Sequence, residues 1–187
     1  MPNWTYCNIN IEGTKEDLNE FMSDAVRRED GTLALSSWIP TPETFEKYDT
    51  TNHPDGKGLK VGDKWWDGLG HHDDQTVTEE LIEEFKKATA EQREKYGVVG
   101  WYDYNCLTFG CKWDCEVEVD DESDSLIILS TETPWTAPEA WLVALSKMYP
   151  RLRFGLHADY EEGFWEDTAF LGGTEAWLGT GNSWDIR

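Results

Sequence analysis

The sequence is short of basic residues. It has 16 lysines and arginines against 38 aspartates and glutamates, so its formal net charge is −22. A small soluble domain usually carries a net charge of about 2–8 in magnitude. Because the electric field of this negative charge repels phosphate, we expect the protein to bind neither nucleic acid nor an anionic membrane directly. The same field attracts a basic protein partner.

The charge is large even on the scale of nucleic acid. A folded chain of 187 residues is about 40 Å across, and duplex DNA of that length carries roughly 24 charges. The net charge therefore rivals that of an equal length of DNA.

Long apolar runs are also missing. The N-terminal stretch MPNWTYCNINIEG has no basic region followed by an apolar segment, and no part of the chain approaches the length of a membrane span. We therefore expect a cytoplasmic protein, in which the four cysteines remain reduced thiols.

The cysteines lack the paired C-x-x-C spacing of many zinc sites. Four intervening residues separate Cys106 from Cys111, three separate Cys111 from Cys115, and Cys7 lies far away in sequence. On a continuous strand, Cys111 and Cys115 would lie about 13 Å apart, too far to share one ion. We therefore predict buried structural thiols and no metal or cofactor. A four-thiolate zinc site is the alternative.

Sequence motifs for common catalytic sites are absent. There is no nucleophile elbow and no phosphate-binding glycine-rich loop followed by lysine and serine or threonine. A cluster of His71, His72, Asp73 and Asp74 lies in a glycine-rich stretch, where a solvated loop before a helix is the favoured interpretation. We predict that the protein is not an enzyme.

Aromatic residues are abundant, with eleven tryptophans, seven tyrosines and seven phenylalanines. Each buries roughly 150–250 Å², so the chain can build a sizeable core. The dense run with Trp101, Tyr102, Tyr104, Phe109 and Trp113 could stack nucleobases on a sheet. Because such platforms have a basic surround, which this chain lacks, core packing is the favoured interpretation.

Residue periodicity predicts an α+β fold. Strands are expected at 3–11, 32–39, 98–109, 112–119, 125–131, 152–160 and 164–171, and helices from Thr14, at 78–96 and at 139–149. This order favours a ferredoxin-like antiparallel sheet with helices packed on one face, plus a long irregular insertion over 41–76. We expect a single domain over 1–187, with an N-terminal lobe 1–97 and a C-terminal ferredoxin-like lobe 98–173 as a possible division around one core.

Four segments resemble a phage and plasmid family, the Api-like or YubB-like family. They are MPNW with Asn8 and Gly13, GWYDYNCLTFGCKWD (100–114), TPWTAPEAWLVALSKMYP (133–150) and YEEG (160–163). The resemblance implies a ferredoxin-like fold, a mobile-element setting and hence a bacterial host cell, without a known catalytic residue. The chain has Cys111 where the family pattern has threonine.

Carboxylates gather in three places, which we predict to bind the partner: Glu79, Glu80, Glu83 and Glu84 on one helix; Asp120, Asp121, Glu122 and Asp124 at one hairpin; and Glu161 and Glu162 at another. If they line one face, they could imitate the phosphates of nucleic acid. The expected function is inhibition of a host nucleic-acid-binding defence complex, as an anti-CRISPR or anti-restriction protein. The alternatives are a small metal- or His/Asp-dependent enzyme and an adaptor that does not mimic nucleic acid.

Overall fold

The computed structural model describes residues 3–65 and 75–182. The chain forms two compact units: unit 1 comprises 1–40 and 107–187, and unit 2 comprises 41–106. Unit 2 is thus inserted into the sequence of unit 1. Contacts divide the chain after residues 40 and 106, whereas the sequence suggested a division at residue 97.

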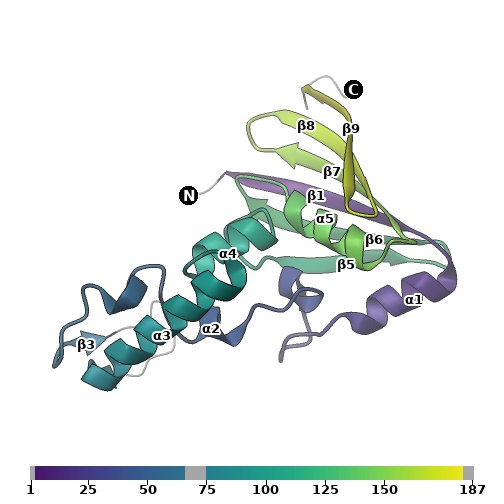
Figure 1. Cartoon of the computed structure of the whole chain (residues 1–187). Helices are drawn as coiled ribbons and strands as arrows, with labels where there is room; N and C mark the ends of the chain where they lie inside the picture. Colours follow the sequence, from purple (N-terminus) through teal and green to yellow (C-terminus); the bar gives the residue numbers. More distant parts are fainter. Residues whose placement is uncertain (1–2, 66–74, 183–187) are drawn as a thin grey trace. The chain divides into compact units, whose positions relative to one another are not determined.

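Unit 1 contains a seven-stranded antiparallel sheet in the order β2–β5–β6–β1–β7–β8–β9 (Figure 1). Its strands are β1 (Trp4–Glu12), β2 (Leu33–Ala34), β5 (Glu116–Glu122), β6 (Leu126–Pro134), β7 (Arg153–Tyr160), β8 (Phe164–Leu171) and β9 (Thr174–Asn182). Its helices are α1 (Lys15–Asp24), the short 3-10 helix η1 (Leu35–Ser37) and α5 (Glu139–Met148).

Central strand β1 separates a buried face from an exposed face. Cys7, Ile9 and Ile11 are buried, whereas Tyr6, Asn8 and Asn10, which alternate with them, are exposed. The buried side chains pack against Phe21 of α1 and Trp141 of α5 in one hydrophobic core. This arrangement confirms the predicted α+β sheet with helices on one face.

The start of α1 follows its sequence signal. The Thr14 hydroxyl accepts a hydrogen bond from the Asp17 backbone N–H and donates one to the Asp17 carboxylate. This contact satisfies one of the free N–H groups that every helix start presents. This cap therefore fixes the residue at which α1 begins after β1.

The predicted strand over residues 98–109 is wrong, because Trp101–Thr108 forms helix α4. Left-handed Gly97 ends the preceding helix and Gly100 (φ +86°) turns the chain before α4. Buried Tyr104 then stacks on Phe45 with ring centroids 4.4 Å apart. Packing on one side of a helix therefore overrides the strand preference of these aromatic residues.

Two other predicted strands are shorter than expected, and neither β9 nor the two short strands of unit 2 were predicted. Of residues 32–39, only Leu33–Ala34 pair with β5, because the chain then coils into η1. Residues 110–115 form a bend, so β5 begins at Glu116 rather than at residue 112. Strand β9 has no clear period in the sequence.

Unit 2 comprises the 41–106 insertion. It contains α2 (Glu43–Glu46), the 3-10 turn η2 (Pro54–Gly56), β3 (Lys64–Trp65), β4 (Gln75–Thr76) and α3 (Glu79–Tyr96), and α4 begins within it (Figure 1). Buried Gln92 of α3 forms hydrogen bonds that connect this helix to neighbouring loops of unit 2. Its amide oxygen accepts from the Thr50 hydroxyl and the Gly100 N–H, and its NH₂ group donates to the Thr44 carbonyl. None of the described helices is both long and apolar enough to cross a membrane.

Candidate functional site

A groove of about 810 Å³ lies over the sheet face opposite the helices of unit 1. Strands β1, β5, β6 and β7 and the bend before β5 build it. Its lining is aromatic and acidic, and the part of the chain described here places no lysine or arginine in it. The lining residues are Trp4, Tyr6, Cys7, Asn8, Trp113, Asp114, Cys115, Glu116, Glu118, Ser130, Thr131, Glu132, His157 and Asp159.

Strand register places carboxylates on both sides of Tyr6. Tyr6 pairs with Glu132 on β6 and with Asp159 on β7. Adjacent strands lie about 4.8 Å apart, and directly paired side chains point to the same face. The exposed Tyr6 ring (46%) is therefore flanked by two carboxylates.

A second row of polar side chains crosses the sheet at Asn8. Asn8 pairs with Ser130 on β6 and with His157 on β7. Ser130 in turn pairs with Glu118 on β5. His157 lies 2.7 Å from the Asp167 carboxylate of β8, measured from ring Nδ1 to Oδ1. Hydrogen-bonding side chains therefore line the groove in the row next to Tyr6, Glu132 and Asp159.

Three tryptophans from distant parts of the sequence meet beside the groove. The Trp113 ring centroid lies 5.9 Å from that of Trp4 and 6.2 Å from that of Trp135. Trp113 and Trp135 are 36% and 48% exposed. The Lys112 ammonium lies 5.2 Å from the Trp113 ring centroid and 5.7 Å from that of Trp135. We call Trp4, Trp113 and Trp135 the tryptophan row.

The backbone holds Trp135 in an uncommon conformation. Its φ of +65° lies in the left-handed region, which bulky residues rarely adopt. The Trp135 N–H donates to the Asn3 carbonyl, and the next residue, Thr136, donates from its hydroxyl to the Gly110 carbonyl. These contacts fix Trp135 beside the bend that carries Trp113.

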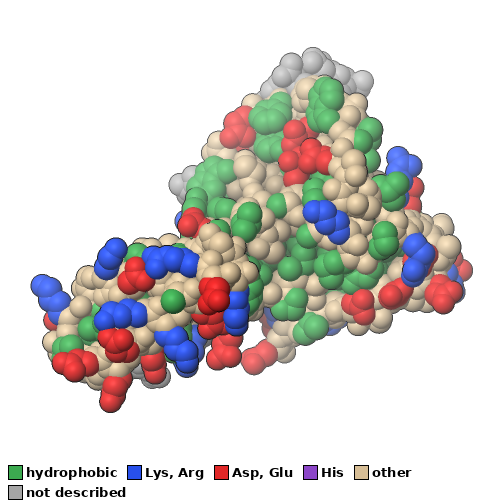
Figure 2. All heavy atoms as spheres, viewed as in Figure 1, with side chains coloured by type: hydrophobic (Ala, Val, Ile, Leu, Met, Phe, Trp, Pro, Cys, Tyr) green, Lys and Arg blue, Asp and Glu red, His purple; other side chains and the backbone are tan. Residues whose placement is uncertain are grey.

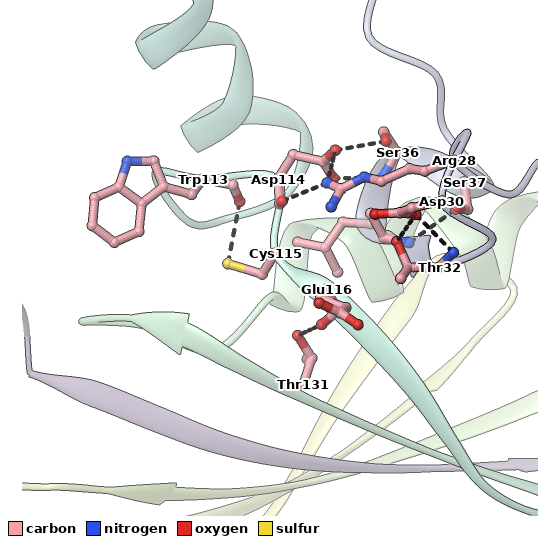
Figure 3. A network of polar contacts seen from close by, with 12 residues as sticks. Arg28, Asp30, Thr32, Ser36, Ser37, Trp113, Asp114, Cys115, Glu116 and Thr131 are labelled. Atoms are coloured by element: carbon pink, nitrogen blue, oxygen red, sulfur yellow. Dashed lines mark hydrogen bonds and ion pairs between the residues drawn. The ribbon is translucent and has the colours of Figure 1, made fainter. Parts of the chain in front are cut away.

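Asp114 anchors that bend (Figure 3). Its carboxylate accepts hydrogen bonds from the backbone N–H and the hydroxyl of Ser36, at 2.8 and 2.7 Å. It also accepts an ion-paired hydrogen bond from Arg28 at 2.6 Å. Figure 3 shows the Trp113 ring pointing away from this network, so Asp114 is held on one side of the bend and the indole is presented on the other.

Two thiols of the bend converge instead of lying on a strand. Cys111 and Cys115 both direct their sulfur at the Trp113 carbonyl, at 3.3 and 3.5 Å. The expected separation of about 13 Å was wrong, because it assumed a strand and the segment is bent. When Cys115 ionises, the Cys111 thiol can turn from the Trp113 carbonyl and donate to the Cys115 thiolate, which lowers the pKa of Cys115 and raises that of Cys111.

The remaining cysteines have different surroundings. Burial raises the pKa of Cys7 to about 12, and Cys106 is exposed. Cys7, Cys111 and Cys115 are buried, as predicted, whereas the prediction of a buried thiol is wrong for Cys106. Among the residues the structure describes, no group of three or more His, Cys, Asp or Glu side chains is placed to hold a metal ion. The absence of a metal site in the whole chain stays a prediction, and the cluster His71–Asp74 lies outside the described residues.

The acidic residues predicted to bind a partner lie in both units. Glu79, Glu80, Glu83 and Glu84 begin α3 in unit 2. There Glu83 pairs with Lys86, and Glu84 accepts from the Tyr48 hydroxyl. Figure 2 shows basic side chains interspersed with acidic ones over α3 on the visible face. On that face, α3 does not present an uninterrupted acidic stripe.

The two acidic hairpins of unit 1 lie at opposite ends of β1. Asp120, Asp121, Glu122 and Asp124 lie toward its Glu12 end, whereas Glu161 and Glu162 lie toward its Trp4 end. Several of these carboxylates contact neighbouring residues. Asp124 pairs with Lys15, Glu161 accepts from the Trp4 N–H, and Glu162 accepts from the Asn3 side chain. The sheet therefore separates the two hairpins, and the groove lies between them.

Sequence reasoning missed the groove carboxylates Glu116, Glu118, Glu132 and Asp159. The available signal was alternation, since Glu116 and Glu118 occupy alternate positions of a strand and so point to one face. Glu132 and Asp159 have no comparable signal. Only the pairing of β6 and β7 with β1 brings them to Tyr6.

Comparisons with known proteins address the fold. No curated protein matches the sequence. A crystal structure of a protein api92 from Yersinia pseudotuberculosis is similar in structure at 9% sequence identity and a TM-score of 0.48, over 97% of this chain and 99% of that one. Residues 112–169, less than a third of the chain, match the family model described as "Ferredoxin-like domain in Api92-like protein". The Api-like resemblance and the ferredoxin-like fold predicted from the sequence are therefore confirmed through this segment.

Proposed function

We propose that the protein is a non-enzymatic inhibitor that binds a basic, nucleic-acid-handling protein and competes with nucleic acid for it. The observation that carries this proposal is the net charge of −22 on an aromatic-rich chain, combined with an acidic groove on unit 1. A surface of this sign attracts basic proteins and accelerates their association at low salt.

The arrangement of β5 supports competition with phosphate. Glu116 and Glu118 alternate along the strand, ahead of the bulge between Val119 and Asp121, so their side chains lie about 6.6 Å apart on one face. The Asp120 carboxylate accepts a hydrogen bond from Ser130 of β6, a groove residue that pairs with Glu118. Carboxylates at this spacing in the groove are a suitable substitute for neighbouring phosphates.

The partner class we propose is a host defence complex that binds nucleic acid, either a CRISPR effector or a restriction enzyme. Such complexes hold nucleic acid in positively charged channels. The mobile-element setting implied by the family resemblance is compatible with this partner. The site of action would then be the cytoplasm of a bacterial host.

Purified protein tests the proposal directly. Basic nucleic-acid-binding proteins captured from a bacterial lysate on the immobilised chain should be identified, and their DNA or RNA binding measured with and without added chain. We expect capture at about 50 mM salt, release by excess duplex DNA, and inhibition that weakens steeply as salt increases.

Two results would count against this function. If captured proteins bind nucleic acid equally well in the presence of the chain, it is an adaptor and not an inhibitor. If capture is insensitive to both salt and duplex DNA, phosphate mimicry is wrong as the mode of binding.

A further inference from the structure

We infer that the groove binds an arginine side chain of the partner, with its guanidinium over Tyr6 and between the carboxylates of Glu132 and Asp159. This inference rests on the proposed function and names the chemistry that its site recognises. The occupant is an extended, arginine-containing segment of a basic protein.

The register around Tyr6 supplies the geometry. Glu132 and Asp159 pair with Tyr6 from opposite sides, so their Cα atoms lie about 10 Å apart across two strand spacings. A cation over the ring is then within reach of a carboxylate on each side. Stacking on the ring and hydrogen bonds to carboxylate act together at such a site.

Neighbouring groups extend the site beyond a single charge. Asn8 and Ser130 lie side by side in the next row and offer hydrogen bonds to a peptide backbone. Glu118 pairs with Ser130 on its other side and adds a further carboxylate. The groove volume of about 810 Å³ holds several side chains of a peptide, so it accommodates a segment and not only one arginine.

The tryptophan row gives internal precedent for binding a cation. Lys112 already places its ammonium within 5.2 Å of the Trp113 ring centroid and 5.7 Å of that of Trp135. Trp4, at the other end of the row, lines the groove two residues before Tyr6 on β1. Alternate residues of a strand share a face, so Trp4 and Tyr6 present adjacent rings to the same ligand.

Arginine fits this site better than lysine. A guanidinium is planar, stacks on aromatic rings and donates from two edges at once, whereas an ammonium is a compact and strongly hydrated charge. Tyr6 provides the stacking surface, and the paired carboxylates provide acceptors for both edges. The site therefore predicts a preference between two peptides of equal charge.

Titration calorimetry with two synthetic dodecapeptides tests the inference, one alternating arginine and serine and the other alternating lysine and serine. We expect the arginine peptide to bind the wild-type chain several-fold more tightly at about 100 mM salt. Glu132→Gln combined with Asp159→Asn should weaken it by about ten-fold or more. Tyr6→Leu should weaken it about three-fold to five-fold and reduce the preference for arginine.

Matched controls separate the groove from overall charge. Glu46→Gln with Glu94→Gln removes the same charge from exposed positions of α2 and α3 in unit 2 and should change affinity less than two-fold. Trp177→Leu removes an exposed aromatic of β9 that pairs with buried Thr168, and should leave affinity unchanged. Urea unfolding of each variant checks that the fold is retained.

Two outcomes would overturn the inference. Equal weakening by the two double substitutions would show that total charge, and not the groove, binds the peptide. Equal affinity of the wild-type chain for both peptides would remove the arginine site. Neither outcome decides the proposed inhibition, because inhibition is measured separately, on nucleic-acid binding by the captured partner.

Discussion

Asp114 and Ser36 are joined by two hydrogen bonds, since the Asp114 carboxylate accepts from both the N–H and the hydroxyl of Ser36. Arg28 pairs with the same carboxylate. These contacts join the bend before β5 to the segment around η1. The position of Trp113 therefore depends on its neighbour Asp114, although the Asp114 side chain points away from the Trp113 ring.

Asp114→Ala should destabilise unit 1 by about 1.5–3 kcal/mol, because the substitution removes charge-assisted hydrogen bonds and leaves their donors without an acceptor. Urea unfolding measures this effect. Glu122→Ala, at the exposed end of β5, is the control and should change stability by no more than about 0.5 kcal/mol. Equal effects of the two substitutions would contradict the anchoring role of Asp114.

Cys115 should be more reactive toward alkylation than Cys7. The hydrogen bond from Cys111 lowers the pKa of Cys115, whereas burial raises that of Cys7 to about 12. In a Cys106→Ser background, iodoacetamide at about pH 7.5 should modify Cys115 first, because the thiolate is the nucleophile. Peptide mapping by mass spectrometry follows each site.

Removing the donor provides the control for this reactivity. Cys111→Ala should slow alkylation of Cys115 by a factor of about three or more, since the thiolate loses its stabilising hydrogen bond. An unchanged rate at Cys115 would show that Cys111 does not tune its pKa.

Gln92→Leu should destabilise unit 2 by about 2–4 kcal/mol. The fully buried Gln92 amide bonds to Thr50, Thr44 and Gly100, and leucine would leave these buried polar groups unsatisfied. Hydrogen exchange of α3 amides measures the loss. Glu94→Ala, on the exposed side of the same helix, should have little effect. Similar exchange in both variants would rule out Gln92 as the organiser of these loops.

Asp17 should contribute a pH-dependent part of the stability of unit 1. Hydrogen bonds from Thr14 and Arg151 lower the pKa of Asp17. Because its pKa is lower in the folded state than in the unfolded state, the contribution is present above the unfolded value of 3.8 and is lost as pH falls through the folded value. Asp17→Asn should therefore lower Tm by a few °C at pH 7, and the difference from wild type should shrink below about pH 3.5.

Calorimetry across this pH range tests the direction in which the contribution of Asp17 to stability changes with pH. Glu29→Gln, in an exposed loop, is the matched control and should track the wild type at every pH. A constant difference between Asp17→Asn and wild type from pH 7 to pH 3 would contradict the linkage to Asp17.

Local signals in the sequence predicted much of the fold. Alternation located β1, Thr14 located the start of α1, and the stretch between Thr78 and Gly97 located α3. The same reasoning failed at α4, where aromatic residues with strand preference pack from a helix. Propensity is a weak guide wherever tertiary contacts decide the conformation.

The candidate site depends on long-range pairing and was therefore harder to predict. Trp4, Trp113 and Trp135 each lie in a segment that carries the family resemblance, yet their spacing in sequence gives no indication that their rings meet. Likewise, Glu132 and Asp159 reach Tyr6 only because β6 and β7 flank β1. The acid clusters visible as runs of letters lie at two hairpins of unit 1 and at the start of α3 in unit 2.

The central place of β1 affects how the chain can fold during synthesis. β1 is made first, yet both of its neighbours come late, since β6 begins at Leu126 and β7 at Arg153. At a translation rate of about 5–20 residues per second, β1 waits on the order of ten seconds for its first partner. Meanwhile the whole of unit 2, continuous from 41 to 106, leaves the ribosome. The inserted unit therefore has the opportunity to fold while both edges of the future central strand are still unpaired.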